Sequence, residues 1–134
     1  MTPREIEDLL ERYHVLDTRG HILHLPLRRR RSSPEPVEIR AAIQRADIDR
    51  ALVMLRRIDE SLWFVIKLVH VIPYPDRAHA DYQEDLLWFM HYADRLRYSL
   101  TTRRQLAALD LSCAYGTVYA RCYSAYRVLA SALG

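Results

Sequence analysis

The sequence predicts an all-α fold. Only three of the 134 residues are glycine, and half of the chain is hydrophobic. Few glycines together with abundant alanine, leucine and arginine favour helices, and apolar residues recur at helical spacing along most of the chain. We therefore expect a single domain, a helical bundle of five to six helices that ends in a pair of consecutive helices.

Residues 1–27 are predicted to form an N-terminal helix and a turn. Thr2 and Glu5 are three positions apart and flank Pro3, which is the pattern of a capping box with proline at the first helical position. The apolar stripe that follows consists of Ile6, Leu9, Leu10 and Tyr13. Segment 21–27 is compatible with a short extended segment or with a loop, because its proline disfavours a central strand.

Residues 28–36 are predicted to be a linker. Four consecutive arginines are followed by Ser-Ser-Pro-Glu-Pro, a composition that does not support a packed element. The linker interpretation is the commoner one for such charged runs. The alternative is an arm that contacts nucleic-acid phosphates. The arginines concerned are Arg28, Arg29, Arg30 and Arg31.

Residues 37–134 are predicted to form the helical core. Helices are expected over 36–46, 47–72 and 81–98, with a candidate break in the second stretch where Ser61 can cap a new helix. The apolar positions expected to face the interior are Ile39, Ile43, Ile48, Ala51, Leu52, Leu55, Leu62, Val65, Ile66, Val69, Tyr82, Leu86, Phe89, Met90, Ala93 and Leu96.

The core is expected to end in two helices within residues 102–133. Thr102 and Gln105 have the capping-box spacing, and Ser112 is placed to cap the second helix, 113–133. The inward face of that helix is expected to carry Tyr115, Val118, Tyr119, Cys122, Ala125, Tyr126, Leu129 and Leu133, with Tyr123 at its edge. The opposite face carries Gly116, Thr117, Ala120, Arg121, Ser124, Arg127 and Ser131. It holds no acid, because Asp110 is the last carboxylate side chain of the sequence.

This C-terminal quarter resembles a known DNA-binding motif. The run from Gln105 to Ser112, then Gly116-Thr-Val-Tyr119, then Ala125 and Leu129, is similar to the helix-turn-helix of sigma-factor region 4 and of phage transcription regulators of the RinA/ArpU kind. The chain departs from that pattern in three places. The stretch from Ser112 to Thr117 is two residues longer, Asp110 stands where a glycine is usual, and the segment between Val71 and Thr101 is far longer than the usual connector.

The resemblance implies a DNA-binding transcription regulator that uses helix 113–133 in the major groove of double-stranded DNA. The residues expected to contact DNA are Thr117, Arg121 and Ser124 at base edges and Arg103, Arg104 and Arg127 at phosphates. RNA polymerase is a further expected partner. A DNA-binding surface with so few arginines also favours a homo-oligomer or a contribution from the 28–31 run.

A second hypothesis from a different class is a helical protein-interaction module. Such a module would bind RNA polymerase or a sigma factor without touching DNA. The acidic first helix and the wide hydrophobic faces fit this hypothesis equally well. Duplex affinity that falls steeply with salt would separate the two.

Enzymatic and metal-binding functions have little support in the sequence. It contains no phosphate-binding glycine loop and no Gly-x-Ser-x-Gly motif, so we expect neither an enzyme nor a cofactor. His21 and His24 offer two ligands where a closed zinc site needs four, so no metal is expected. Cys113 and Cys122 fall on nearly opposite faces of one helix and are expected to stay reduced. The sequence has neither a secretion signal nor a membrane-spanning run, and we expect a cytoplasmic protein with no membrane partner.

Overall fold

The computed structural model describes residues 1–16, 36–72, 77 and 80–134. These residues contain helices and no strand, which confirms the all-α prediction. The helices are α1 (Pro3–Glu11), α3 (Pro36–Ile58), α4 (Glu60–His70), α5 (Tyr82–Tyr92), the 3-10 helix η2 (Ala93–Arg97), α6 (Leu100–Asp110) and α7 (Tyr115–Leu133). The predicted turn and segment at 17–27, the arginine run at 28–31 and the histidine pair at 21 and 24 lie outside the described residues.

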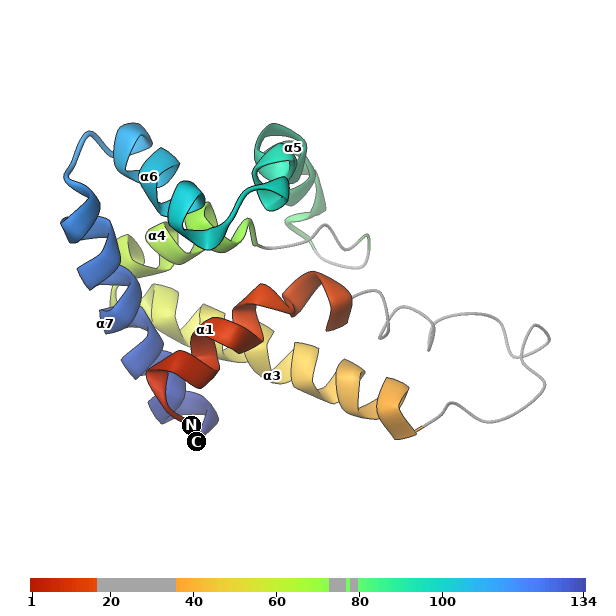
Figure 1. Ribbon diagram of the computed structural model, residues 1–134. Coiled ribbons are helices and arrows are strands. Elements are labelled where there is room, and N and C mark those ends of the chain that lie inside the picture. The colour runs from red at the N-terminus through yellow and green to blue at the C-terminus, as the bar shows by residue number, and fades with distance from the viewer. Residues whose placement is uncertain (17–35, 73–76, 78–79) are drawn as a thin grey trace.

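The C-terminal helix α7 is the packing centre of the fold. It lies against α1, α3, α4 and α6, and Figure 1 shows it along one side of the molecule. The side chains that it buries are Val118, Cys122, Ala125, Tyr126 and Leu129, all on the face predicted from helical spacing. Because four helices pack against α7, one face of it is occupied by the core. Any binding function of α7 is therefore confined to its solvent-exposed face.

Helix α1 begins as its sequence predicts. The Thr2 hydroxyl accepts a hydrogen bond from the Glu5 backbone N–H at 3.2 Å, and the Glu5 carboxylate reaches back to the Thr2 N–H at 3.4 Å. The predicted apolar stripe is buried, including Tyr13 in the helical residues 13–16 beyond α1. The Tyr13 hydroxyl donates to Asp49 of α3 at 2.7 Å, which ties the end of this N-terminal segment to the long helix.

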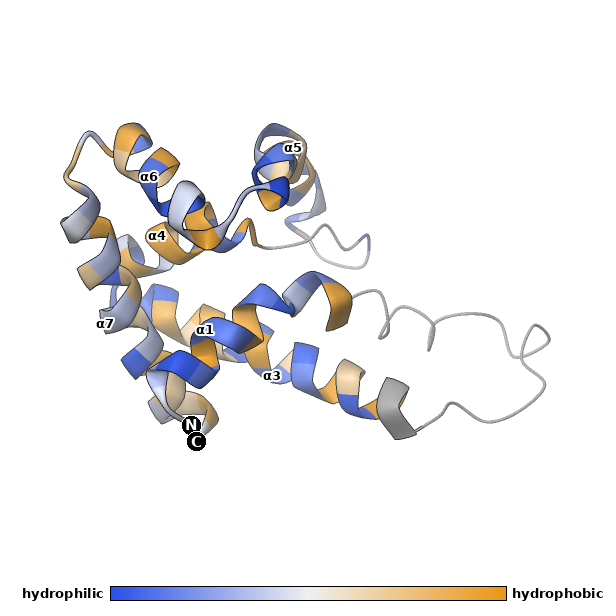
Figure 2. Ribbon diagram, viewed as in Figure 1, coloured by the Kyte–Doolittle hydropathy of each residue, from blue (hydrophilic) through white to orange (hydrophobic). Residues whose placement is uncertain are grey.

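The stretch 36–72 forms two helices whose break differs in detail from the prediction. Helix α3 begins at Pro36, where a helix was predicted, but it runs without a break to Ile58, so the predicted boundary between residues 46 and 47 is wrong. Asp59, rather than the expected Ser61, caps α4 by accepting hydrogen bonds from the backbone of Ser61 and Leu62. Helix α4 is central and largely apolar, as predicted (Figure 2).

The helical range predicted at 81–98 agrees closely with the observed residues 82–97, but the type of helix after residue 92 and the face toward the core differ from the prediction. A single helix was expected over 81–98, but the chain tightens into the 3-10 helix η2 at Ala93. No residue of α5 is buried, and Met90, which was expected inside, is 70 % exposed. Trp88 and Tyr92 face the core instead. The Lys67 ammonium lies 4.2 Å from the centre of the Trp88 ring, so a cation–π contact fastens α5 to α4.

The residues that precede α6 and α7 form short turns, and the N-caps of both helices differ from the prediction. Ser99, not Thr102, caps α6 by accepting a hydrogen bond from the Thr102 N–H at 3.2 Å. Residues 111–114 then connect α6 to α7. Ser112 was expected to cap α7, but it has a left-handed backbone with φ of 51°, and Ala114 precedes the helix without a side-chain cap.

The described part of the chain contains no helix with the length and apolarity needed to cross a bilayer.

The left-handed turn at Ser112 leads to a stability prediction. An L-residue in this conformation costs about 1–2 kcal/mol, a penalty that glycine does not carry. Glycine also increases the freedom of the unfolded chain, which offsets part of the gain. We therefore expect Ser112→Gly to raise the free energy of unfolding by about 0.5–1 kcal/mol in thermal or urea unfolding. Ser112→Ala keeps the strained backbone and is the matched control; an equal gain in that variant would contradict the explanation.

Candidate nucleic-acid interface

The outward face of α7 is open to solvent. Arg121 and Arg127 are exposed, and Thr117 and Ser124 are half-buried at the sides of the same face. Between them lie small residues, and no atom lies within 4 Å of a Cβ built on Gly116. Figure 2 shows α7 mostly in pale colours, in contrast to the alternating blue and orange of α1. The face is therefore accessible and weakly polar, with few charges.

The two exposed arginines of α7 do not form a single cluster. At about 100° per residue, positions six apart are separated by about 120° around the helix axis. Arg121 lies on the side of Thr117, and Arg127 lies nearer the centre of the exposed face. A partner that touches both must cover a broad part of the helix surface.

Arg121 also has an acidic neighbour. Hydrogen bonds from Ser61 and Leu62 lower the pKa of Asp59, and the positive charge of Arg121 contributes to the same shift. Asp59 belongs to the start of α4, which is distant in sequence but close in the fold. The expected acid-free surface therefore holds for α7 itself but not for its surroundings.

The assignment of Arg103 and Arg104 as phosphate contacts is corrected by the structure. Both side chains are buried and form ion pairs with α1. Arg103 donates to the Glu11 carboxylate at 2.6 Å, and Arg104 donates to the Glu7 carboxylate at 2.8 Å. Arginines satisfied in this way by internal carboxylates are not available to an external phosphate.

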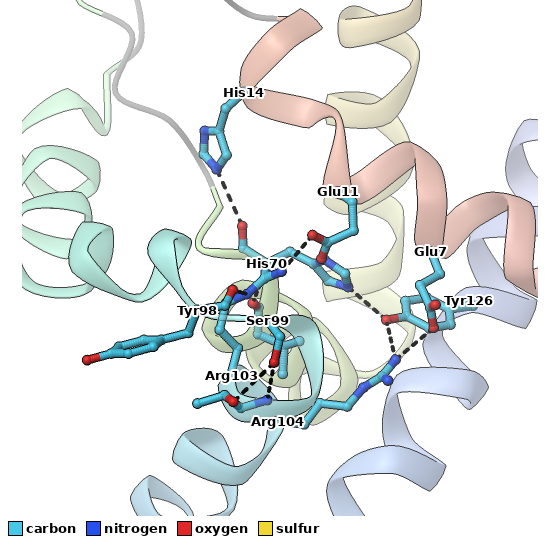
Figure 3. A network of polar contacts seen from close by, with 11 residues as sticks. Glu7, Glu11, His14, His70, Tyr98, Ser99, Arg103, Arg104 and Tyr126 are labelled. Carbon is cyan, nitrogen blue, oxygen red and sulfur yellow. Dashed lines mark hydrogen bonds and ion pairs between the residues drawn. The ribbon is translucent and has the colours of Figure 1, made fainter.

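These arginines belong to a polar network that joins four helices (Figure 3). His70 of α4 lies between Glu11 and Tyr126, with its Nδ1 3.1 Å from the Glu11 carboxylate and its Nε2 2.7 Å from the Tyr126 hydroxyl. Arg104 donates to the same hydroxyl at 3.1 Å. Arg103 adds a hydrogen bond to the Val69 carbonyl at 3.0 Å. The network therefore links α1, α4, α6 and α7 through side chains that are mostly buried.

The direction of each hydrogen bond follows from the ionised groups. A carboxylate only accepts hydrogen bonds, so the proton of His70 lies on Nδ1 and points to Glu11. Burial keeps the His70 ring neutral, so its Nε2 carries no proton and accepts a hydrogen bond from the Tyr126 hydroxyl. The oxygen of that hydroxyl accepts a hydrogen bond from Arg104. The order of groups resembles a nucleophilic triad, but Tyr126 and His70 are both fully buried. This arrangement is built for stability and offers no access to a substrate.

The pKa values of the network result from two opposing effects, which are burial of the side chains and their interactions with neighbouring charges and hydrogen-bond donors. Burial lowers the pKa of His70, against the attraction of Glu11. Burial alone would raise the pKa of Glu11, but hydrogen bonds from His70 and Arg103 outweigh it and lower that pKa to about 2. Burial also raises the pKa of Tyr126. At neutral pH the network therefore contains charged Glu11 and Arg103 beside neutral His70 and Tyr126.

The helical tyrosines form a row, and two of them differ from the prediction. Tyr115 and Tyr119 were expected to face the core, but both are exposed, Tyr119 to 43 %. The ring centroids of Tyr119 and Tyr123 are 4.8 Å apart, and the Arg104 guanidinium lies 5.1 Å from the Tyr119 ring centre. A hydrogen bond with Tyr119 raises the pKa of Tyr123 to about 12. The exposed α7 face thus has aromatic residues along one flank and Arg121 on the other.

The structure adds no support for metal chemistry. Across the described ranges, no group of three His, Cys, Asp or Glu side chains is arranged to hold a metal ion. Cys113 and Cys122 are both free, and they form no disulfide with each other. Burial raises the pKa of the Cys122 thiol, which makes it a poor nucleophile.

A second accessible surface lies on α3 and was missed from the sequence. Ile39 and Ile43 were assigned to the interior, but both are exposed. Where α3 meets the end of α7, a hollow of about 310 Å³ is lined by Asp47, Arg50, Ala51, Met54, Ala132 and Leu133. Helical spacing alone could not identify this surface, because α3 carries apolar residues on two opposite faces.

Comparison with known proteins gives no match: no family model, no curated protein and no solved structure corresponds to this chain. The resemblance of 102–133 to sigma-factor region 4 and to the RinA/ArpU regulators therefore stays a prediction.

The ion pairs between α1 and α6 lead to a stability prediction. Glu11→Gln leaves the buried Arg103 guanidinium without its counter-charge, and removing one partner of a buried pair costs about 3–5 kcal/mol. Because Glu11 is partly exposed, we expect the free energy of unfolding to fall by an amount near the lower end of this range, about 3 kcal/mol, in urea unfolding. Arg97→Gln removes an exposed arginine and should change stability by less than about 0.5 kcal/mol. Equal small effects of both variants would contradict the role of the network.

The network also makes stability depend on pH. The pKa of His70 is below its ordinary value of 6.5 in the folded chain, so below pH 6.5 the unfolded chain binds a proton that the folded chain does not. Glu11, at about 2 instead of 4.5, adds a second loss as the pH falls from 4.5 toward 2. We expect the free energy of unfolding to be highest above pH 6.5 and to fall below it by up to about 1.4 kcal/mol per pH unit for each group.

Urea unfolding at a series of pH values measures this dependence. In His70→Gln the slope just below pH 6.5 should become shallower, although the half-buried His14, whose pKa is also lowered by burial, keeps part of it. Part of the further loss of stability below pH 4.5 should remain, because Arg103 still lowers the pKa of Glu11. An unchanged slope just below pH 6.5 would contradict the contribution of His70.

Proposed function

We propose that this protein binds double-stranded DNA through the outward face of α7 and acts as a regulator of transcription. One observation supports this more than any other: Thr117, Arg121, Ser124 and Arg127 all lie on the accessible side of a helix that follows a short turn from α6. The buried side of the same helix is fixed by four neighbours. A rigid helix with an open outer face is what insertion into the major groove requires.

In this proposal the α7 residues have different roles. Thr117 and Arg121 lie on one side of the N-terminal half of the helix, where a recognition helix contacts base edges. Arg127 lies two turns further along and would contact a phosphate, fixing position rather than sequence. Tyr115 and Tyr119 border the same half and offer hydroxyls for phosphate or sugar contacts. Arg103 and Arg104 have no direct role, because their charges are satisfied by α1.

The number of available cations limits the affinity of a single chain. Two arginines on α7 correspond to a salt dependence with a log–log slope of only about −2 for duplex DNA. Specific regulators make more phosphate contacts than this. The proposal therefore requires more positive charge, from the run at 28–31 or from a second copy of the chain.

A second candidate function is a protein-interaction module that binds RNA polymerase or a sigma factor. The observation that favours it is the exposure of Leu87 and Met90 on α5, a helix without any buried residue. Exposed apolar side chains that lie close together mark sites of protein association. This function needs no free cation on α7.

Fluorescence anisotropy with a labelled DNA duplex at low and moderate salt tests the DNA proposal. We expect affinity that falls with salt and a loss of at least about tenfold in Arg121→Ala/Arg127→Ala, because each phosphate or base contact contributes about 1 kcal/mol or more. Arg97→Ala removes an exposed charge from η2 and is the control.

Two outcomes would refute DNA binding by α7. One is an affinity no tighter than about 10⁻⁴ M at low salt. The other is an equal loss in the Arg97→Ala control, which would indicate a general effect of charge. Either outcome would favour the interaction module.

A further inference from the structure

Helix α3 has a second face that the fold leaves uncovered. Its inner face packs into the core with Ala41, Ile48, Ala51, Leu52 and Leu55. On the opposite side, exposed residues repeat at alternating spacings of four and three: Ile39, Ile43, Ala46, Arg50, Val53 and Arg57. We refer to these six residues as the α3 seam. Ile43 is 57 % exposed and Val53 is 54 % exposed, so the seam is not covered by the described residues.

The spacing of the α3 seam is that of a coiled coil. Alternating steps of four and three residues keep one stripe facing a partner helix along its whole length. A surface helix normally places polar residues on its outer side, whereas here four of the six positions are apolar. Helix α3 is also the longest helix among the described residues, with 23 residues, and Figure 1 shows its N-terminal turns extending away from α4, α6 and α7.

A hollow beside the seam gives a partner helix a further surface to contact. Arg50 belongs to the seam and also lines the hollow of about 310 Å³ between α3 and the end of α7. Met54 and Leu133 make part of its wall apolar. A helix lying along the seam would place side chains at the mouth of this hollow.

We propose that the partner is a second copy of this chain, with the two α3 helices packed antiparallel about a two-fold axis between Ala46 and Arg50. In this register Arg50 opposes the partner's Ala46, whose small side chain leaves room for the arginine. Ile43 opposes the partner's Val53, and each contact occurs twice, as an isologous interface requires. The outermost layer pairs Ile39 with the partner's Arg57, which can extend its charged end into solvent.

Charge selects this orientation. In a parallel pair Arg50 would face the partner's Arg50, and the arginines at 57 would meet in the same way, which is unfavourable. In the antiparallel pair Arg50 inserts beside the partner's Asp47, one residue after the opposing alanine. Within one chain Asp47 already pairs with Arg50, and this exposed pair contributes little. When two chains associate, each gives up its internal Asp47–Arg50 pair and the dimer gains two such pairs between the chains. This exchange therefore costs little free energy.

This dimer does not depend on DNA binding, although it would double the arginines that the proposed regulator presents. Its test is therefore made without DNA, by sedimentation equilibrium of the full chain over a range of concentrations. We expect a reversible dimer. Ile43→Glu should raise its dissociation constant by at least about tenfold, because it puts a charge in an apolar layer. Leu87→Glu makes the same kind of change on exposed α5 and should leave the dimer intact.

A charge exchange tests the register even if Ile43→Glu impairs folding. Asp47→Arg alone and Arg50→Asp alone should each weaken self-association, because each places like charges together. An equimolar mixture of the two variants should recover a dimer that contains one copy of each. Circular dichroism of each variant verifies that the helices are retained.

Four outcomes would overturn the proposal. A wild-type chain that stays monomeric would leave the α3 seam to another occupant, such as a different helix or residues of the same chain. A dimer that Ile43→Glu does not weaken would place the interface elsewhere. Charge variants that dimerise as well as the wild type, or a mixture that does not recover a heterodimer, would refute the antiparallel register.

Discussion

The fold depends on the pairing of two buried arginines with the carboxylates of α1. Arg103 and Arg104 bring positive charge into the interior, and buried charge is tolerated only when it is paired and hydrogen-bonded. Glu7 and Glu11 meet that requirement, and His70 and Tyr126 extend the pairing to α4 and α7. Helix α1 is thus held by specific polar contacts as well as by its apolar stripe. Those contacts fix its position along α6 in a way that apolar packing alone would not.

The network also changes the relation between the α6–α7 pair and the DNA proposal. Two of the arginines that make the C-terminal quarter look basic in sequence serve the interior instead. What remains on α7 is a small, open and weakly charged face with tyrosines on one flank and Arg121 near Asp59 on the other. Such a face can enter a groove sterically, but it provides little electrostatic attraction. Self-association through the α3 seam is one way to supply more.

Local features of the fold were predictable from the sequence. The all-α class, the capping box at Thr2, the apolar stripe of α1 and the inward face around Cys122 depend on interactions within a few residues. The helix break near residue 59 was also expected, although its cap was assigned to the wrong residue. Patterns of this kind report which side of a helix is apolar and where it starts.

Features that depend on distant partners could not be predicted. The carboxylates that pair with Arg103 and Arg104 are 92 and 97 residues away in sequence. The neighbouring residues in the sequence do not distinguish these arginines from exposed ones. Ile39 and Ile43 illustrate the opposite error, because an apolar stripe does not reveal whether the same chain covers it. Tyr115 and Tyr119 illustrate the same error, because they were expected to face the core but are exposed.

The pairing of α1 with α6 and α7 has a consequence for biosynthesis. Helix α1 leaves the ribosome well before its partners, because Arg103 follows Glu11 by 92 residues and Arg104 follows Glu7 by 97 residues. Until α6 emerges, the carboxylates of α1 have no guanidinium to pair with. Until α7 emerges, the apolar stripe of α1 also lacks a main packing partner. Helices α1, α4, α6 and α7 therefore reach their final packing only after α7 has been synthesised, and α1 stays unpaired while the chain between it and α6 is made.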